Sequence, residues 1–175
     1  HGQQAGGAVQ FHFGKGGGDR SKYGSKFKVA IRALAQSMKD EVIERYVLEI
    51  PENDTADGGI DVVALNDLAD DAAGIPVFFG QCAAQQKGWP EKKFEAHALN
   101  LEKYISFFHK PGALLIIPLM YRNPNGAWIS GESHQTILLD RLRIIRLLEA
   151  RGSTGAIKAA LDTVHPELRP HLAVA

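Results

Sequence analysis

The chain of 175 residues is long enough for one compact domain, and its 45% hydrophobic and 23% charged residues exclude a disordered or fibrous protein. Twenty basic and 20 acidic residues give a formal net charge of zero. Binding to nucleic acid would therefore need a local basic surface, because the molecule as a whole does not attract phosphates.

A single cysteine, Cys82, excludes a disulfide within the chain, and no apolar run reaches the ~18–20 residues needed to cross a bilayer. We therefore expect a cytoplasmic protein without membrane association. The sequence opens on His-Gly-Gln-Gln, with no methionine and no signal pattern, so we expect a fragment or a chain that lacks some segments.

Residues 1–25 are rich in glycine and serine and show little hydrophobic periodicity, which predicts a flexible segment. The stretch "GKGGGDRSKYGS" lacks the spacing of a phosphate-binding loop. Basic residues around the end of this segment, interleaved with Tyr23 and Phe27, are candidates for contacts with a nucleic-acid backbone. They are Lys15, Arg20, Lys22, Lys26 and Lys28. The alternative is a solvated run of charges.

From residue 26, apolar residues at helical spacing predict an amphipathic helix. These residues are Phe27, Ile31, Leu34 and Met38. The run "RYVLEI", residues 45–50, has the composition of a strand, and Pro51 ends it.

Two further strands are predicted in "IDVVAL", residues 60–65, and "IPVFFGQCA", residues 75–83. The Asn, Asp and Gly residues between them favour a hairpin, so we expect the strands to be antiparallel.

Pro90 suits the first turn of a second helix, and an apolar stripe continues that helix to residue 108. The apolar run "ALLIIPL", residues 113–119, predicts a central strand, and residues 136–150 predict another helix. Residues 152–175 suggest a short helix and a tail. This order predicts a three-layer α/β domain over residues 26–150, with residues 1–25 and 151–175 outside it.

Asp61 follows two glycines at the start of a predicted strand, a position from which a carboxylate can bind a divalent cation. Gln81 on the paired strand offers an amide oxygen, and the carbonyl of Cys82 offers another. Asp57 is a candidate second acid, although Asp is also common in turns. The alternative is that Asp61 caps a turn and Gln81 satisfies a local hydrogen bond. We expect the Cys82 side chain to be buried as a small apolar residue.

The motif "DGGIDVVA", followed by "FFGQCA", resembles the active-site core of the PD-(D/E)xK nuclease superfamily, especially the Mrr-like restriction endonuclease branch. In that branch a Gly-Gly-Ile/Val-Asp strand is followed by Gln-Cys-Lys on the next strand. The predicted order of helix, three strands, helix and strand, over roughly residues 26–119, also matches the superfamily's core. The resemblance implies a restriction-endonuclease-like fold with an added C-terminal helix.

One position departs from the superfamily pattern, because Ala83 stands where the catalytic lysine is expected. Related families supply the ammonium group from a neighbouring position, often the following helix. Lys92, in the first turn of the predicted second helix, is our preferred candidate, and Lys87 is the second.

The resemblance implies a Mg²⁺- or Mn²⁺-dependent endonuclease that acts on DNA in restriction or antiviral defence, together with other domains or subunits or as a homo-oligomer. Asp61 and Gln81 would hold the ion, with Cys82 and Asp57 as further ligands. The absence of lysine at position 83 supports a second hypothesis, a nuclease-fold module that binds nucleic acid or a protein without cleavage. A third is an unrelated α/β domain for a small ligand.

Overall fold

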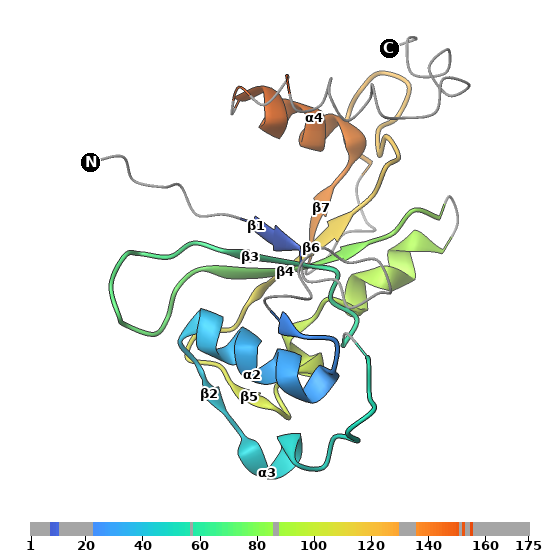
Figure 1. Ribbon diagram of the computed structural model, residues 1–175. Coiled ribbons are helices and arrows are strands. Elements are labelled where there is room, and N and C mark those ends of the chain that lie inside the picture. Colours follow the sequence, from blue (N-terminus) through green and yellow to red (C-terminus); the bar gives the residue numbers. More distant parts are fainter. Residues whose placement is uncertain are drawn as a thin grey trace.

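The structure is a computed structural model and describes residues 8–10, 23–56, 58–85, 88–129, 136–150, 152 and 155. Within these residues a five-stranded sheet lies across the middle of the molecule (Figure 1). Its strands, in spatial order, are β1 (Ala8–Gln10), β3 (Val62–Leu65), β4 (Val77–Cys82), β6 (Gly112–Ile116) and β7 (Ile137–Leu139). The pairs β1–β3 and β3–β4 are antiparallel, whereas β4–β6 and β6–β7 are parallel, so the sheet is mixed.

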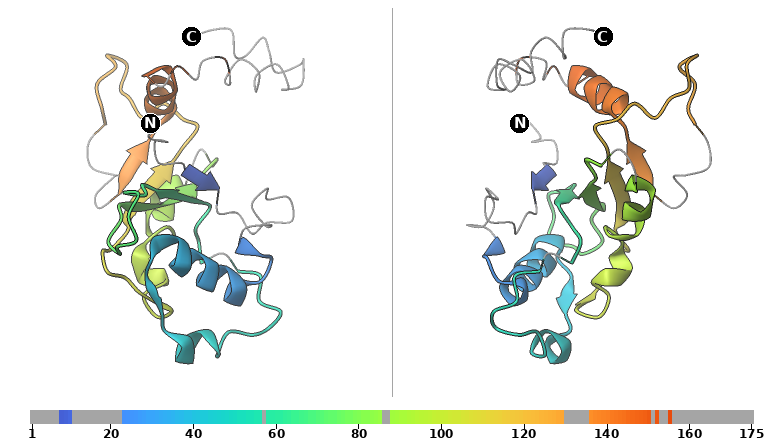
Figure 2. Two further views of the ribbon diagram at one scale, coloured as in Figure 1. Left: turned by 60° about the vertical axis from the view of Figure 1, so that its left-hand side comes forward. Right: turned by 90° about the vertical axis from the view of Figure 1, so that its right-hand side faces the viewer.

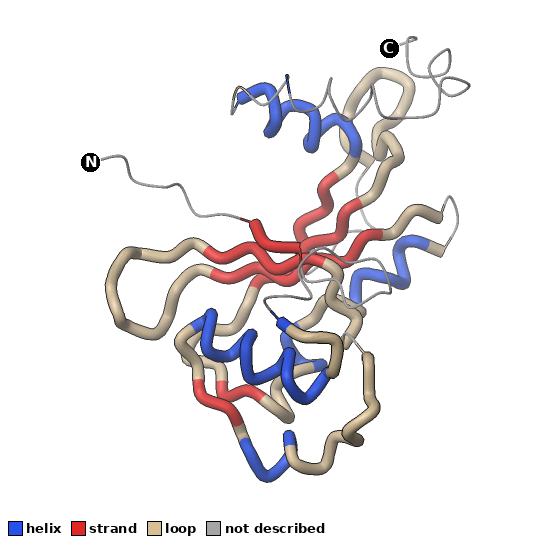
Figure 3. Tube along the Cα trace, in the orientation of Figure 1, coloured by secondary structure: helices blue, strands red, loops and turns tan. Residues whose placement is uncertain are grey.

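Helices of two kinds surround this sheet (Figure 3). The α-helices are α2 (Phe27–Met38), α3 (Glu44–Val47) and α4 (Arg141–Ala150), and the 3₁₀ helices are η1 (Trp89–Phe94) and η2 (Ala98–Asn100). A small antiparallel pair, β2 (Glu41–Val42) and β5 (Ile105–Ser106), lies beyond α2. The fold is therefore mixed α/β, as expected. None of the described helices has the length and apolar character that a bilayer crossing requires.

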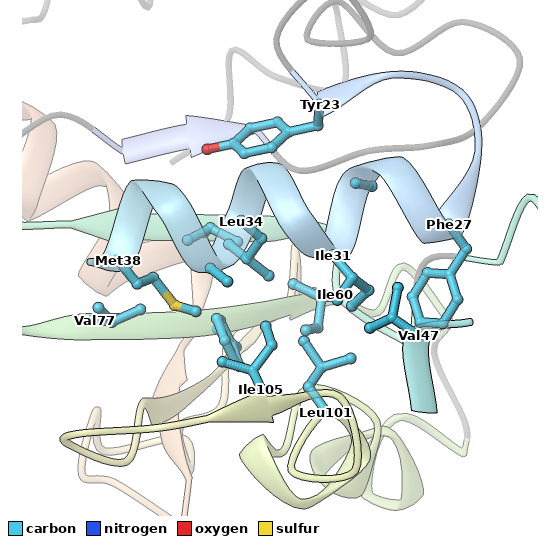
Figure 4. Packing of buried hydrophobic residues seen from close by; sticks show 14 of the residues in the cluster. Tyr23, Phe27, Ile31, Leu34, Met38, Val47, Ile60, Val77, Leu101 and Ile105 are labelled. Carbon is cyan, nitrogen blue, oxygen red and sulfur yellow. The ribbon is translucent and has the colours of Figure 1, made fainter. Parts of the chain in front are cut away.

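The predicted first helix is confirmed as α2, and its apolar stripe forms the centre of the main core. Phe27, Ile31, Leu34 and Met38 are all buried, and in Figure 4 they point toward Ile60, Val77, Leu101 and Ile105. Full burial of each such side chain contributes about 1.5–3 kcal/mol relative to exposure. The packing of this stripe therefore holds α2 against β3 and β4.

One face of the sheet carries both hydrophobic clusters. Side chains alternate along a strand, so Val77, Phe79 and Gln81 of β4 share a face. Val77 and Phe79 are buried in the cluster that contains α2. Leu115 of β6, the register partner of Gln81, belongs to a second cluster with Trp89 of η1. Gln81 therefore lies between the part of the sheet covered by α2 and the part covered by η1.

The opposite face of the sheet is apolar but only partly covered within the described chain. Val62, Phe78 and Ile116 are half-buried, and Ile137 is 46% exposed. Helix α4 lies beside the β7 end of the sheet, as the two views of Figure 2 show.

The first correction concerns the expected flexible segment over residues 1–25. Residues 8–10 form β1, which pairs with β3 at the edge of the sheet, and Tyr23 is only 2% exposed in the main core. The fold therefore includes parts of the chain before residue 26. The Gly-rich stretch "GKGGGD" lies outside the described residues.

The expected strand over residues 45–50 is wrong, because this segment is the short helix α3 followed by turns. Val47 and Ile50 are its two buried residues, and their spacing of three suits a helical turn and not an alternating strand. Arg32 of α2 binds Glu44 with both Nε and Nη2, at 3.0 and 2.7 Å, which fixes the start of α3.

The expected long helix from Pro90 to residue 108 is also wrong, since η1, η2 and β5 occupy this range. His97 is extended, with φ −94° and ψ 139°, and its Nδ1 accepts a hydrogen bond from the N–H of Leu99. Asn100 Nδ2 donates to the carbonyl of Glu95 at 2.6 Å. These side-chain bonds replace the helical backbone bonds.

The expected hairpin of two strands and the central strand are confirmed as β3, β4 and β6. The helix expected over residues 136–150 is correct only from Arg141, because residues 137–139 form β7. Asp140 separates the two elements: its Oδ1 accepts from the N–H of Arg143 at 2.9 Å and caps the helix. The tail expected after residue 152 lies almost entirely outside the described residues.

Candidate functional site

The antiparallel pair β3 and β4 brings the predicted acid and glutamine to the same end of the two strands. Asp61 directly precedes β3, and its N–H donates to the carbonyl of Gly80 at 2.9 Å. Its carboxylate Oδ2 accepts a hydrogen bond from the N–H of Cys82 at 2.7 Å. The main chain and side chain of Asp61 therefore bond the residues on either side of Gln81.

The amide oxygen of Gln81 is the most unusual polar atom of this site. Oε1 is buried and has no hydrogen-bond partner in the part of the chain that the structure describes. A buried polar atom left without a bond costs about 1–3 kcal/mol. Such a group is retained at a cost to stability, and a cation or a ligand donor that reached Oε1 would remove that cost.

Two glycines position the start of β3. Gly58 and Gly59 have φ values of +65° and +77°, a region that other residues rarely adopt. A Cβ atom at Gly59 would lie 2.7 Å from the carbonyl oxygen of Glu95. Glycine is therefore needed both for the turn into Asp61 and for the close approach of the segment after η1.

Lys92 lies in η1, and its Nζ is 2.5 Å from Oε1 of Glu95. Because Glu95 contacts Gly59, the ion pair belongs to the segment packed beside the turn that leads into Asp61. Its side chains are partly exposed, 33% for Lys92 and 39% for Glu95. Lys87, the second candidate, lies outside the described residues.

Ala83 is 4% exposed, in the cluster that includes Trp89, Leu115 and Ile117. Side chains alternate along a strand, so Ala83 lies on the same face of the sheet as Gln81, the candidate metal ligand. Trp89 packs in this cluster, so η1 covers the position where the superfamily pattern has its lysine.

Cys82 is exposed, so the expectation that its side chain is buried is wrong. Partial burial and the nearby Asp61 carboxylate raise the pKa of the Cys82 thiol, which keeps it protonated at neutral pH. Its contribution to the site in this structure is the N–H bonded to Asp61.

The remaining predicted residues are spread over several places. Asp57, Arg20 and Lys22 lie outside the described residues. Lys28 forms an ion pair with Glu52, and Lys26 is exposed just before α2. The N–H of Phe27 donates to the carbonyl of Asp54, so the start of α2 lies beside the loop that leads to Gly58.

The described residues contain no cluster of three or more His, Cys, Asp or Glu side chains that could hold a metal ion. A Mg²⁺ site does not need such a cluster, because this ion commonly takes one or two carboxylates and completes its shell with water and substrate phosphate oxygens. Asp61 and Gln81 fit that description with one carboxylate and one unsatisfied amide oxygen.

Sequence reasoning missed Glu95, which pairs with Lys92, and Asn100, which holds the carbonyl of Glu95. The spacing Lys92–Glu95 could have indicated the ion pair, since residues three apart face each other on a helical turn. Contact of Glu95 with Gly59 joins residues far apart in the sequence, and no local pattern predicts it.

Comparisons with family models, with curated proteins and with solved structures found nothing that matches this chain.

Proposed function

We propose that this chain is a metal-dependent nuclease that hydrolyses phosphodiester bonds of DNA, as the resemblance to the PD-(D/E)xK superfamily implies. The observation that carries the proposal is that the Asp61 carboxylate, bonded to the N–H of Cys82, and the buried, unsatisfied Oε1 of Gln81 belong to the same end of the paired strands β3 and β4. The main chain on both sides of Gln81 is bonded to Asp61, so the backbone that carries the two residues is fixed before any ligand arrives.

Asp61 and Gln81 would hold the Mg²⁺ or Mn²⁺ ion. When bound, such an ion polarises a phosphoryl oxygen and lowers the pKa of a bound water. The protein contributes a fixed carboxylate, an amide oxygen that loses no better bond on binding, and an apolar wall formed by Ala83, Trp89 and Leu115.

In this proposal Lys92 supplies the ammonium group that the superfamily carries at position 83. Its ion pair with Glu95, whose main chain lies against Gly59, supports the assignment. Glu95 holds the ammonium group in the absence of substrate. A phosphate oxygen of the substrate would compete with Glu95 for Lys92. The Lys92 ammonium group would then place a positive charge beside the scissile bond. Antiviral defence is the role that the resemblance implies for such an enzyme, and the single cysteine favours a reducing, cytoplasmic setting.

A second candidate function is a nuclease-fold module that binds DNA or a partner protein without cleaving. This function is favoured by Ala83, which is buried in one cluster with Trp89. Position 83, two residues after Gln81 on the same face of the sheet, therefore provides no ammonium group. Lys92 is 33% exposed and paired with Glu95, which is also compatible with a purely structural role.

The test is a cleavage assay on a panel of plasmid, linear, methylated and single-stranded DNA with Mg²⁺ or Mn²⁺. Asp61→Asn is the matched variant, since its amide oxygen can still accept the Cys82 N–H bond while the charge is lost. We expect wild-type cleavage that disappears with EDTA and in Asp61→Asn, with an unchanged melting temperature. Salt-dependent DNA binding without cleavage would instead support the binding module, and equal cleavage by Asp61→Asn would refute the assignment of the site.

A further inference from the structure

Helix α4 is amphipathic in sequence but has no buried residue. Its sequence, RLRIIRLLEA, contains five large aliphatic residues, and Ile145 and Leu147 are 37% and 51% exposed. An apolar helix surface of this kind normally packs against another element. In Figure 1, α4 lies beyond the end of β7, away from the cores that hold the rest of the domain.

Between α4 and β7 lies an open pocket of about 450 Å³. It is lined by Ile137, Leu139, Leu147, Arg143 and Arg146. Its volume falls within the range of about 300–1,000 Å³ that is usual for ligand sites. The aliphatic side chains come from α4 and from the face of β7 opposite the two hydrophobic clusters. The two guanidinium groups come from α4, and none of these lining residues is acidic.

Arg143 is fixed before any ligand binds. Its Nη1 donates to the carbonyl of Leu138 at 2.8 Å, and its guanidinium lies 4.3 Å from the ring centroid of Trp128. Arg122 packs on the same ring at 4.6 Å, and its Nε donates to the fully buried carboxylate of Asp140. A guanidinium held in place loses little conformational freedom when it binds an anion.

We propose that this pocket binds an acidic amphipathic peptide segment of a partner protein, which places aliphatic side chains against Ile137, Leu139 and Leu147. Carboxylates of the segment would pair with Arg143 and Arg146. The charge of α4 complements such a partner, because the helix carries three arginines and one glutamate. This inference does not depend on nuclease activity.

DNA is a poorer fit to the same surface. A phosphate backbone would pair with the arginines but would leave the exposed Ile137 and Leu147 without apolar contacts, and these residues are 46% and 51% exposed. A peptide with both acidic and aliphatic residues covers both features, as in other helix-in-groove interactions.

The experiment is selection of a random 16-residue peptide library, displayed on phage, against the immobilised full chain. Enriched peptides are then synthesised with a fluorescein label and their affinities are measured by fluorescence anisotropy. Arg146→Glu reverses one charge of the pocket, and Leu147→Ser removes one apolar contact. Arg141→Glu is the control, because it makes the same charge change on α4 at a residue that does not line the pocket. Circular dichroism establishes that each variant is folded.

We expect enriched peptides that combine Asp or Glu with Leu, Ile or Phe. Their affinity should fall at least tenfold for Arg146→Glu and Leu147→Ser, and less than twofold for Arg141→Glu. The proposal is overturned if no peptide is enriched, if the pocket variants bind as well as the control, or if a 20-base-pair duplex binds α4 with the same dependence on Arg146. Self-association lost in Leu147→Ser, measured by light scattering, would assign the surface to a second copy and would also overturn it.

Discussion

Among individual residues, Gln81 gives the strongest reason to interpret this end of β3 and β4 as a functional site. Most buried amide oxygens in folded proteins are bonded, whereas Oε1 is buried without a partner in the described chain. Asp61 adds the negative charge, and its bond to the N–H of Cys82 fixes its orientation.

Replacing Gln81 separates function from stability. Gln81→Leu removes the unsatisfied oxygen, so the free energy of unfolding should rise by about 1 kcal/mol while Mn²⁺ binding is lost. Gln81→Glu should retain or increase Mn²⁺ affinity, because a second carboxylate strengthens the site. Urea unfolding and calorimetric Mn²⁺ titration of both variants measure these effects. Reduced stability of Gln81→Leu together with normal Mn²⁺ binding would contradict the metal-site interpretation.

Lys92 is the residue on which cleavage depends in the proposed enzyme. Lys92→Ala should reduce the cleavage rate by about two to four orders of magnitude, the usual effect of losing one donor that stabilises transition-state charge. Mn²⁺ binding should be unchanged. Lys103→Ala is the control, because Lys103 pairs with Glu49 on a different part of the surface. A rate within twofold of wild type in Lys92→Ala would leave Lys87 as the remaining candidate.

The position of Ala83 changes what a restored lysine can do. Ala83 is packed with Trp89, Leu115 and Ile117, so Ala83→Lys would place a longer, charged side chain into an apolar cluster. Overpacking of this kind costs about 1–3 kcal/mol. A lysine at position 83 would therefore be costly in this cluster, which is consistent with the proposal that Lys92 supplies the ammonium group.

At the scale of elements, the junction of β7 and α4 depends on Asp140. This carboxylate is fully buried, and it accepts bonds from the N–H groups of Arg143 and Tyr121 and from Arg122. Burial alone would raise the pKa of Asp140, but these hydrogen bonds and the charge of Arg122 outweigh it, so the pKa lies below its ordinary value of 3.8. The folded state therefore favours the ionised carboxylate.

Asp140→Asn should lower the free energy of unfolding by about 3 kcal/mol at pH 7, because it leaves the charge of Arg122 without its partner. Because the pKa of Asp140 is lower in the folded state, the ionised carboxylate stabilises the protein at pH values above its ordinary pKa of 3.8. This stabilisation is lost as the pH falls through the pKa of the folded state. The difference in the free energy of unfolding between the wild type and Asp140→Asn should therefore become smaller below about pH 4. Urea unfolding from pH 7 to pH 3 measures it, and a constant difference would contradict this role.

Elements with a strong local pattern could be predicted from the sequence, and elements shaped by distant contacts could not. The stripe of Phe27, Ile31, Leu34 and Met38 was sufficient for α2, and the apolar runs were sufficient for β3, β4 and β6. The region after Pro90 has the same helical spacing, but His97 and Asn100 bond to the backbone and divide it. Asp140 was an available signal for the start of α4, because Asp before an apolar helix is a common N-cap.

For the molecule as a whole, the sequence predicted a three-layer α/β domain, and the structure confirms the mixed α/β class. Helices α2 and η1 cover one face of the sheet, whereas the opposite face is partly covered by α4 and contains the pocket beside β7. Strand β1 joins the sheet through pairing with β3, a contact across more than fifty residues that no local pattern indicates. The pairing of Asp61 and Gln81 was predictable because a hairpin connects their strands.

The proposal for the whole protein depends on one site that holds a divalent ion between Asp61 and Gln81. The most direct measurement is a crystal structure of the chain soaked in Mn²⁺, with anomalous diffraction data that locate the metal. We expect an anomalous peak at about 2.0–2.5 Å from a carboxylate oxygen of Asp61 and from Oε1 of Gln81, and no peak in Asp61→Asn crystals. Ordered density for both side chains without an anomalous peak between them would contradict the metal-dependent nuclease.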